Sequence, residues 1–387
     1  MDEAIAAVVG VGATPYSRAS EATPLEMAAT ALQAALADAD MEAADLDGLV
    51  VNVGSPRGVD YDVLCDRLGI SAAYTLQTWS HGRFAMSCLQ TAAMAVRSGL
   101  ARSVAVLRVS KSSKRLQYGG AADLEGSREG GGPHGELPHY GLTAPASGAA
   151  MAARLYMLRY DVDEDALGPV AATIRDHATR NPRAIFQEPF DLDAYRMSPM
   201  LIDPLRRLDF SIAADGAICL LVQAPSGEQV TSRSLLLTGM QGVQAGSEEF
   251  VFARPGLGMA QQRRSPFAPS RADGRAFSIA GIAAENIDAF YTYDAFSPLV
   301  WFALERFGFC GEGEAAAFCE GDGLAIGGRL PTNTNGGLLS EGHLSGFNHL
   351  VEIAAQLRGE GGDRQVRGIR RAMWGSCFGD ALVFEAA

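Results

Sequence analysis

Short apolar runs alternate with helix-period segments along this chain, and the alternation limits the folds that it can adopt. The apolar run at 4–10 ends in a glycine, residues 24–36 repeat apolar side chains at helical spacing, and residues 46–51 return to strand character. Strands of this length, separated by amphipathic helices, are typical of sheets covered by helices. The order strand, helix, strand therefore predicts a layered α/β fold.

The same order continues through the first half, where a helix of small residues and two buried strands are expected at 82–98, 104–108 and 217–222. A break rich in turn-forming residues follows at 224–232, and strand character resumes at Leu235. We therefore expect an N-terminal half at 1–224 and a C-terminal half at 232–387.

The segment at 285–292 repeats the pattern of the segment at 44–51. Each places an aspartate, Asp288 or Asp47, at the start of a buried strand. Together with the repeated order of elements, this echo indicates two similar α/β halves.

Residues from about 111 to 147 have a different composition. They combine glycine runs with Pro133, Pro138 and Pro145, which argues for a long loop excursion from the first half. Long loops in compact domains are often lids or interaction elements.

Composition excludes several classes of protein. The chain has 387 residues, of which 48% are hydrophobic, so it can bury a large core. A net charge of −13 argues against a nucleic-acid surface. The six cysteines show neither metal-ligand spacing nor the density of a disulfide scaffold, so we expect reduced thiols in a cytoplasmic protein without a metal site. The start of the chain is acidic and lacks a secretory signal, and no run approaches the ~20 apolar residues of a membrane span.

The segment at 333–346 gathers conformationally special residues around one titratable group, His343. The glycines in it are Gly336, Gly337, Gly342 and Gly346. Glycines permit sharp turns and close approach of the backbone to a ligand. A helix-period segment follows at 347–358, so the loop is expected at the start of a helix, where free backbone N–H groups collect. The alternative is a tight connection around a structural histidine.

The run Asn-Thr-Asn-Gly-Gly-Leu-Leu-Ser-Glu-Gly-His that ends at His343 resembles the C-terminal signature of the thiolase superfamily, together with Gln-Leu-Arg-Gly-Glu at 356–360. The resemblance is closest to the sterol-carrier-protein-type thiolase-like branch and covers essentially the whole chain. It implies a thiolase fold of two similar α/β halves in a layered αβαβα arrangement. It also implies an active-site histidine at His343 and a homodimer joined through sheet edges of the first half.

Thiolases carry a nucleophilic cysteine at the start of a helix in the first half, but the corresponding position here falls on Gly82. Cys88 lies more than a helical turn later among apolar neighbours, and we interpret it as a packed, inert thiol. The family's second cysteine position falls nearer Trp374 than Cys377, so Cys377 is only a candidate pocket residue. His81, beside Gly82, could enter the vacated pocket or lie at the surface. Acyl transfer through a cysteine is therefore not expected.

Tyr293, in the segment at 290–298, stands where many relatives carry an active-site histidine. This pattern resembles the thiolase-like aldolases of steroid side-chain degradation, which lack the nucleophilic cysteine and use tyrosine. In those enzymes a second tyrosine occupies the position of His343. The alternative for Tyr293 is a core aromatic. Asp294 could orient Tyr293 or bond the backbone at the start of the following helix, and the second is favoured. His349 is interpreted as structural.

The resemblance implies a carbon–carbon lyase that cleaves a 3-hydroxyacyl-CoA with a steroid or other bulky side chain by a retro-aldol reaction. The products would be a ketone or aldehyde and a shorter acyl-CoA such as acetyl-CoA or propionyl-CoA. Tyr293 or His343 would be the base and the other the proton donor. The substrate-binding candidates are Gly82, Asp294, Gly336, Gly337, Gly346 and Cys377. Gly82, Gly336 and Gly337 are expected to hold the thioester oxygen.

The same resemblance implies that CoA enters only as part of the substrate, with no covalently bound cofactor. It also implies a small zinc-ribbon/OB-fold partner protein, for which the loop at 111–147 is a candidate contact. Two alternatives remain open at this point. One is a non-catalytic thiolase-like subunit that binds acyl-CoA or lipid, and the other is an atypical acyltransferase that works through Cys88.

Overall fold

The computed structural model describes residues 4–52, 58–78, 84–111, 145–244 and 274–387. Nine strands form the main sheet: β1 (Ala6–Ala13), β2 (Gly48–Asn52), β3 (Tyr74–Thr78), β4 (Ser103–Ser110), β7 (Gly216–Gln223), β8 (Leu235–Gln241), β9 (Ala289–Tyr291), β10 (Arg371–Gly375) and β11 (Ala381–Ala386). A separate small sheet pairs β5 (Met200–Ile202) with β6 (Leu205–Arg206).

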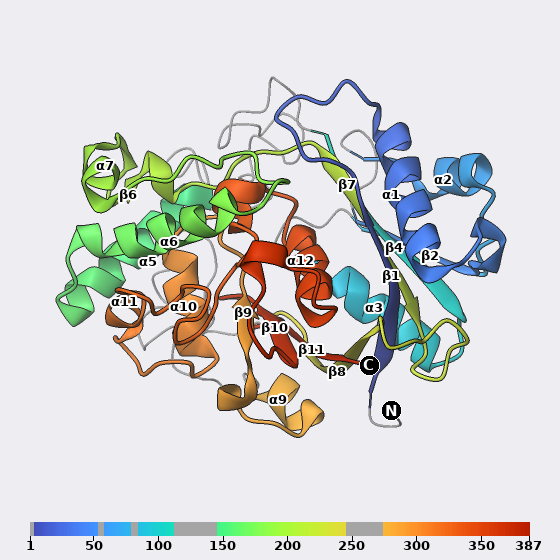
Figure 1. Ribbon diagram of the computed structural model, residues 1–387. Helices are drawn as coiled ribbons and strands as arrows, with labels where there is room; N and C mark the ends of the chain where they lie inside the picture. Colours follow the sequence, from blue (N-terminus) through green and yellow to red (C-terminus); the bar gives the residue numbers. More distant parts are fainter. Residues whose placement is uncertain (1–3, 53–57, 79–83, 112–144, 245–273) are drawn as a thin grey trace, which may run out of the picture.

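The described helices surround the main sheet (Figure 1). They are α1 (Pro24–Ala39), α2 (Tyr61–Leu68), α3 (Ser87–Arg97), α5 (Pro145–Tyr160), α6 (Gly168–Thr179), α7 (Leu192–Met197), α9 (Arg275–Ala280), α10 (Pro298–Arg306), α11 (Ala315–Phe318) and α12 (Phe347–Leu357). The first helix begins where its sequence signals a start. Thr23 caps it and forms a reciprocal capping box with Glu26, and Pro24 occupies the first turn.

The strand order reveals two halves with the same topology. The order is β3-β2-β4-β7-β1-β8-β11-β10-β9, so β1 and β8 meet at the centre in antiparallel pairing. Moving outward from the centre, each half has two antiparallel pairs and then a parallel pair, β4 with β2 in the first half and β10 with β9 in the second. The first half then adds β3, which runs parallel to β2. The expected fold of two similar α/β halves is confirmed. The boundary at 224–232 stays a prediction, and that segment connects β7 to β8.

Asp47 and Asp288, the aspartates that the two halves repeat, accept equivalent backbone hydrogen bonds. Asp47 Oδ1 accepts backbone N–H bonds from Arg102 at 2.8 Å and Ser103 at 2.9 Å, at the start of β4. Asp288 Oδ2 accepts from Arg370 at 2.8 Å and Arg371 at 2.9 Å, at the start of β10. Each carboxylate therefore fixes the start of the strand that runs parallel to its own.

Helices cover both faces of the sheet, which explains why its strands are apolar on both sides. In β1, Ala6 and Val8 belong to the central core, whereas Ala7 and Val9 pack in the outer core with α1. Figure 1 shows α3 and α12 in the middle of the molecule, with α1 and α2 beyond the strands of the first half. On the second half, α9 packs against β8 and β11. The layers therefore match the expected αβαβα arrangement.

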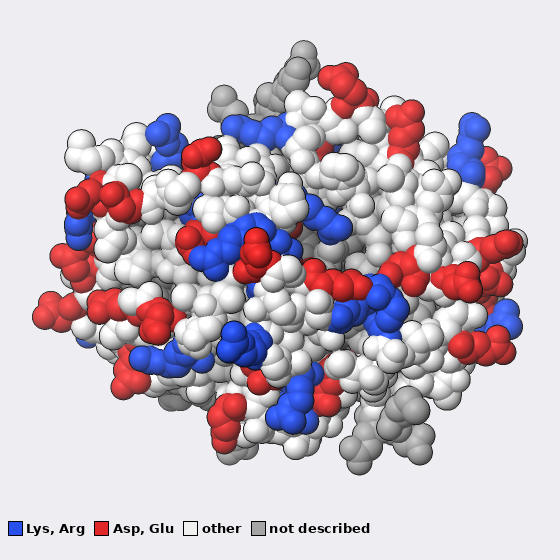
Figure 2. All heavy atoms as spheres, in the orientation of Figure 1, with Lys and Arg blue, Asp and Glu red and all other residues white. Residues whose placement is uncertain are grey.

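The predicted excursion at 111–147 falls mostly at 112–144, outside the described residues, and α5 begins at Pro145. On the face shown in Figure 2, acidic and basic side chains are interspersed, and neither sign fills a continuous patch. Among the described residues, no helix combines the length and apolar character that crossing a bilayer requires.

Candidate active site

Two residues that are fifty positions apart in the sequence form one hydrogen-bonded pair. Tyr293 lies just after β9, and its hydroxyl is 3.0 Å from Nε2 of His343. Their rings meet edge to face, with centroids 5.6 Å apart and an interplanar angle of 81°. Tyr293 is buried and His343 is partly buried. The two predicted catalytic residues therefore face each other, as expected, while their roles stay predictions.

His343 is attached to the first half through its backbone. Its N–H donates to the carbonyl of Ile212 at 2.6 Å, and it forms a parallel bridge with Ala213, just ahead of β7. The preceding Gly342 has φ of 149°, and a Cβ there would lie 2.8 Å from the Cβ of Ala214. Only glycine allows the chain to pass this close. The histidine side chain thus projects from a backbone fixed between both halves.

The environment of His343 favours the neutral imidazole. Burial, together with the positive charge of Arg108, lowers the pKa of His343 to about 4. The ring is therefore uncharged at neutral pH and can accept a proton. The tyrosine hydroxyl is an acid of much higher ordinary pKa, so the pair joins a proton donor to a proton acceptor.

The carboxylate of Asp294 accepts hydrogen bonds from the backbone of the glycine-rich segment. Its Oδ1 accepts the N–H of Leu338 at 2.8 Å and its Oδ2 accepts the N–H of Leu339 at 3.3 Å. These residues belong to a single π-helical turn, Gly337–Glu341. We expected Asp294 to bond the backbone at the start of the following helix. It does bond backbone N–H groups, but they belong to this π-helical turn and not to that helix. The turn, rather than α12, is where N–H groups gather, and the carboxylate satisfies them.

The backbone N–H groups of Gly336 and Gly337 have partners inside the protein, and the expectation that their loop holds a thioester oxygen stays a prediction. The N–H of Gly336 donates to the carbonyl of Asn333 at 2.9 Å, and the N–H of Gly337 donates to Oδ1 of Asn335 at 3.2 Å. Both donors are used inside the protein. A Cβ at Gly336 would lie 2.5 Å from the Cβ of Ala178, so internal packing requires this glycine.

Gly346 is also required by internal packing, in this case against Trp374. It has φ of 90° directly before α12, and a Cβ there would lie 3.0 Å from Nε1 of Trp374. Cys377 is buried, and burial raises the pKa of its thiol. Its carbonyl accepts from Arg306 Nη1 at 3.2 Å. Substrate contact by Gly346 or Cys377 stays a prediction.

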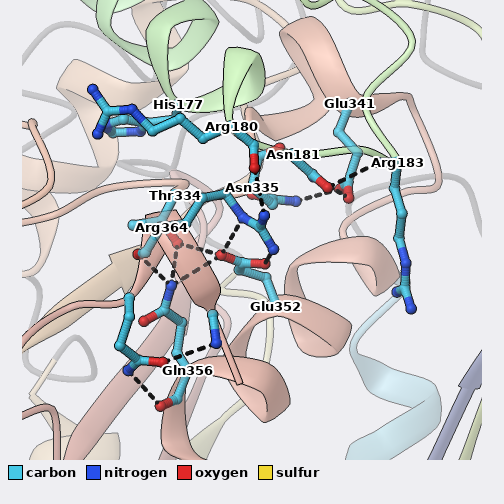
Figure 3. Close-up of polar contacts among 12 residues, drawn as sticks. His177, Arg180, Asn181, Arg183, Thr334, Asn335, Glu341, Glu352, Gln356 and Arg364 are labelled. Atoms are coloured by element: carbon cyan, nitrogen blue, oxygen red, sulfur yellow. Dashed lines mark hydrogen bonds and ion pairs between the residues drawn. The ribbon is translucent and has the colours of Figure 1, made fainter. Parts of the chain in front are cut away.

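Glu341 is a buried carboxylate that the sequence analysis missed. It accepts side-chain N–H bonds from Asn181 at 2.8 Å and from Asn335 (Figure 3). A third side-chain N–H bond comes from Asn348 at 2.7 Å. Burial raises its pKa to about 7, against the effect of the amide bonds. The amides come from the end of α6, the glycine-rich segment and α12, so Glu341 joins three elements next to His343.

A second buried carboxylate ties α12 to the segment. Glu352 accepts from Thr334 at 2.9 Å and pairs with Arg364 through both oxygens at 3.1 and 3.0 Å (Figure 3). His349, on the same helix, has Nε2 3.4 Å from Asp294 Oδ1 and Nδ1 3.2 Å from Asn335 Oδ1. His349 therefore has a structural position, as the sequence indicated.

Cys88 is fully buried within α3, and its thiol bonds to Asn52 at 3.4 Å and Thr78 at 3.6 Å. Burial raises its pKa, which opposes formation of the nucleophilic thiolate. This setting favours the packed thiol over an acyl-transfer nucleophile. Gly82 and His81 lie outside the described residues. Within the described ranges, no group of three or more histidine, cysteine or carboxylate side chains could hold a metal ion.

The sequence of this chain is similar to those of several known proteins. Residues 259–382 match the family described as Thiolase C-terminal domain-like. The chain is 32% identical over 376 residues to the steroid side-chain-cleaving aldolase of Thermomonospora curvata, covering 92% of this chain and 90% of that protein. It is 31% identical over 366 residues to the 17-hydroxy-3-oxo-4-pregnene-20-carboxyl-CoA lyase of Mycobacterium tuberculosis, covering 92% of each.

Solved structures agree on the fold. The structure described as an Ltp2-ChsH2(DUF35) aldolase superposes with a TM-score of 0.86 at 30% identity, over 98% of this chain and 97% of that one. Human mitochondrial 3-ketoacyl-CoA thiolase superposes with a TM-score of 0.69 at 15% identity, over 99% of each chain. The second likeness supports the fold alone, and the predicted thiolase fold is thereby confirmed.

Proposed function

Because this chain belongs to the thiolase superfamily, in the branch that contains the steroid side-chain-cleaving aldolases, we propose that it is a carbon–carbon lyase that cleaves a 3-hydroxyacyl-CoA by a retro-aldol reaction. The single observation that carries the proposal is the hydrogen bond between Tyr293 and His343, at 3.0 Å. No hydride or acyl acceptor is needed for this chemistry.

The reaction begins when the pair removes the proton from the hydroxyl on Cβ. The oxygen electrons form the carbonyl of the departing ketone or aldehyde, the Cα–Cβ bond breaks, and its electrons move into the thioester enolate. The enolate Cα then takes back a proton, which gives the shorter acyl-CoA. A neutral imidazole bonded to a phenol can accept the first proton and supply the second through the same hydrogen bond, since each group is an effective acid or base when positioned.

We infer a bulky acyl group on the substrate. The relatives with the highest stated identity are named for steroid side chains and for a pregnene-carboxyl-CoA. The resemblance implies that Gly82 takes the position of the nucleophilic cysteine of thiolases, so the acylation that would compete with cleavage is not expected. CoA is part of the substrate, and no bound cofactor or metal is required.

The proposal includes assembly with other chains. β3 lies at one edge of the nine-stranded sheet, and Tyr61 and Val63 of the nearby α2 are 44% and 41% exposed. Exposed strand edges tend to be covered by partners. We propose a homodimer through this edge. The related aldolase structure is of a complex named for two components, which supports a partner protein for this chain. We propose that this partner is a small zinc-ribbon/OB-fold protein. All six cysteines are free thiols, which supports a cytoplasmic location.

The test is product release from a 3-hydroxyacyl-CoA whose β-carbon carries a ring substituent, with and without the candidate partner. The expected result is equimolar formation of the ring ketone and the shorter acyl-CoA. Tight binding of the acyl-CoA without either product, in the presence of the partner, would refute the lyase and favour a non-catalytic binding subunit.

A further inference from the structure

His349 is fully buried on α12 and lies between polar groups from two other parts of the chain. Its Nε2 is 3.4 Å from Oδ1 of Asp294, and its Nδ1 is 3.2 Å from Oδ1 of Asn335. Asp294 directly follows Tyr293, and Asn335 belongs to the glycine-rich segment that contains His343. The imidazole of His349 therefore joins the two chain segments that carry the candidate acid/base pair.

The side-chain amide of Asn335 presents its oxygen to His349. Asn335 Nδ2 donates to a carboxylate oxygen of Glu341, and Asn335 Oδ1 accepts the N–H of Gly337 at 3.2 Å. Exchanging the two amide atoms would place the oxygen against the carboxylate and the NH₂ group against the N–H. Because Asn335 offers an acceptor to His349, the contact requires a proton on Nδ1 of the imidazole.

The carboxylate of Asp294 also presents an acceptor to His349. Its two oxygens accept the backbone N–H groups of Leu338 and Leu339, and such bonds favour the charged form of a carboxylate. Asp294 is fully buried, and a buried charge needs a partner. Among the residues that the structure describes, no lysine or arginine lies within ion-pair distance of Asp294, whereas His349 does.

Both ring nitrogens of His349 thus face oxygens that accept protons. A neutral imidazole has one N–H, and here Asn335 requires it on Nδ1. The bare Nε2 would then direct its lone pair at Oδ1 of Asp294, with no proton between the two acceptors. An imidazolium has an N–H on each nitrogen and can pair with the amide and the carboxylate together.

The other groups around the imidazole accommodate a positive ring. Tyr291 of β9 has its ring centroid 6.1 Å from that of His349, and burial raises the pKa of Tyr291, which keeps the phenol neutral. On α12, Glu352 lies three residues further on and is paired with Arg364 at 3.0 Å. A positive His349 opposes protonation of His343, which the proposed reaction uses in its uncharged form.

We propose that His349 is a positioning residue that carries protons on both ring nitrogens and, as the counter-ion of Asp294, holds the π-helical turn so that His343 meets Tyr293. The catalytic meaning of this inference rests on the proposed function. The protonation of His349 can be measured without turnover and is tested separately. His349 takes no proton from the substrate in the reaction described above.

The test is a long-range proton–nitrogen NMR spectrum of protein labelled with nitrogen-15 at its six histidines, recorded at neutral pH. The signals of His349 are those that His349→Gln removes, and both of its nitrogens should have the shift of a protonated imidazole nitrogen. His177→Gln is a matched control, because His177 is also fully buried but contacts Asn333 instead of Asp294, so the same signals should persist. One bare nitrogen in His349 overturns the proposal.

The wild-type spectrum is sufficient for refutation even if His349→Gln does not fold. If none of the six histidines has two protonated nitrogens, the proposal is wrong without any assignment. If one has, Asp294→Asn supplies the assignment, because this neutral residue of the same shape removes the counter-ion. That histidine should then lose its second proton, and a spectrum unchanged in Asp294→Asn counts against the pairing.

In lyase assays, His349→Gln should lower kcat by about 10²-fold with little change in KM, since a displacement of about 1 Å in an acid/base pair has an effect of this size. An unchanged kcat in the folded variant overturns the positioning role. A wild-type protein without lyase activity refutes the proposed function, but it leaves the NMR spectrum as a complete test of the ion pair between His349 and Asp294.

Discussion

Replacing Gly337 by alanine tests the attachment of the glycine-rich turn to Asp294. Gly337 has φ of +61°, and a Cβ there would lie 1.9 Å from Oδ2 of Asp294. The carboxylate would have to move, which breaks its bonds to Leu338 and Leu339. Gly359 is a matched control, because it has φ of +73° and a Cβ there would meet nothing within 4 Å.

The magnitudes follow from these two environments. A left-handed backbone costs an alanine about 1–2 kcal/mol, which is the whole loss expected for Gly359→Ala. Gly337→Ala should lose the same amount plus two hydrogen bonds to a buried charge, each contributing about 1.5–3 kcal/mol. The expected loss for Gly337→Ala is therefore about 4 kcal/mol or more.

Urea denaturation of both variants, followed by circular dichroism, gives the two free energies of unfolding. A double-mutant cycle sharpens the comparison: in an Asp294→Ala background the oxygen that clashes is gone, so Gly337→Ala should cost no more than the control. Equal losses in Gly337→Ala and Gly359→Ala, with Asp294 present, would show that the carboxylate does not support the turn.

Three further predictions concern the acid/base pair and its surroundings. Tyr293→Phe keeps the ring contact with His343 but removes the hydroxyl, so turnover should fall ~10²–10⁴-fold with little change in the unfolding midpoint, and a mild loss would remove Tyr293 from the proton path. Cys88→Ser should leave the lyase rate unchanged, whereas loss of activity would revive acyl transfer through this thiol. The pKa of Glu341 is raised to about 7 by burial, so the folded state binds its proton more tightly than the unfolded state. Its contribution to stability should be full below about pH 4.5 and decline as pH rises to 7, and urea titrations of wild type and Glu341→Gln across this range should differ in slope with that sign.

Much of the fold followed from local patterns. The strand expected at 104–108 is β4, and the helix expected at 347–358 is α12 to within one residue. The echo between Asp47 and Asp288 was readable because both carboxylates satisfy the same need, the free N–H groups at the start of a neighbouring strand. Such needs are local, and sequence spacing reflects them.

The buried residues that surround the candidate active site were harder to predict from the sequence. Glu341 is surrounded by amides from Asn181 and Asn348, which come from the loop after α6 and from α12 and meet only in the folded chain. We interpreted Gly336 and Gly337 as ligand-binding because a backbone without Cβ atoms lets a ligand approach closely. In the structure the same openness lets Ala178 and Asp294 approach, and sequence alone cannot distinguish a protein neighbour from a bound one.

The attachment of His343 to the first half has a genetic consequence. Tyr293 and His343 both belong to the second half, but the backbone N–H of His343 is bonded to the carbonyl of Ile212 in the first half. The second half expressed alone contains both groups but lacks the backbone contacts with Ile212 and Ala213 that hold His343. A nonsense allele that ends the chain between β7 and β8 lacks both groups and should be null, and a separate fragment that encodes the later half should restore activity only by reassembling with the first half.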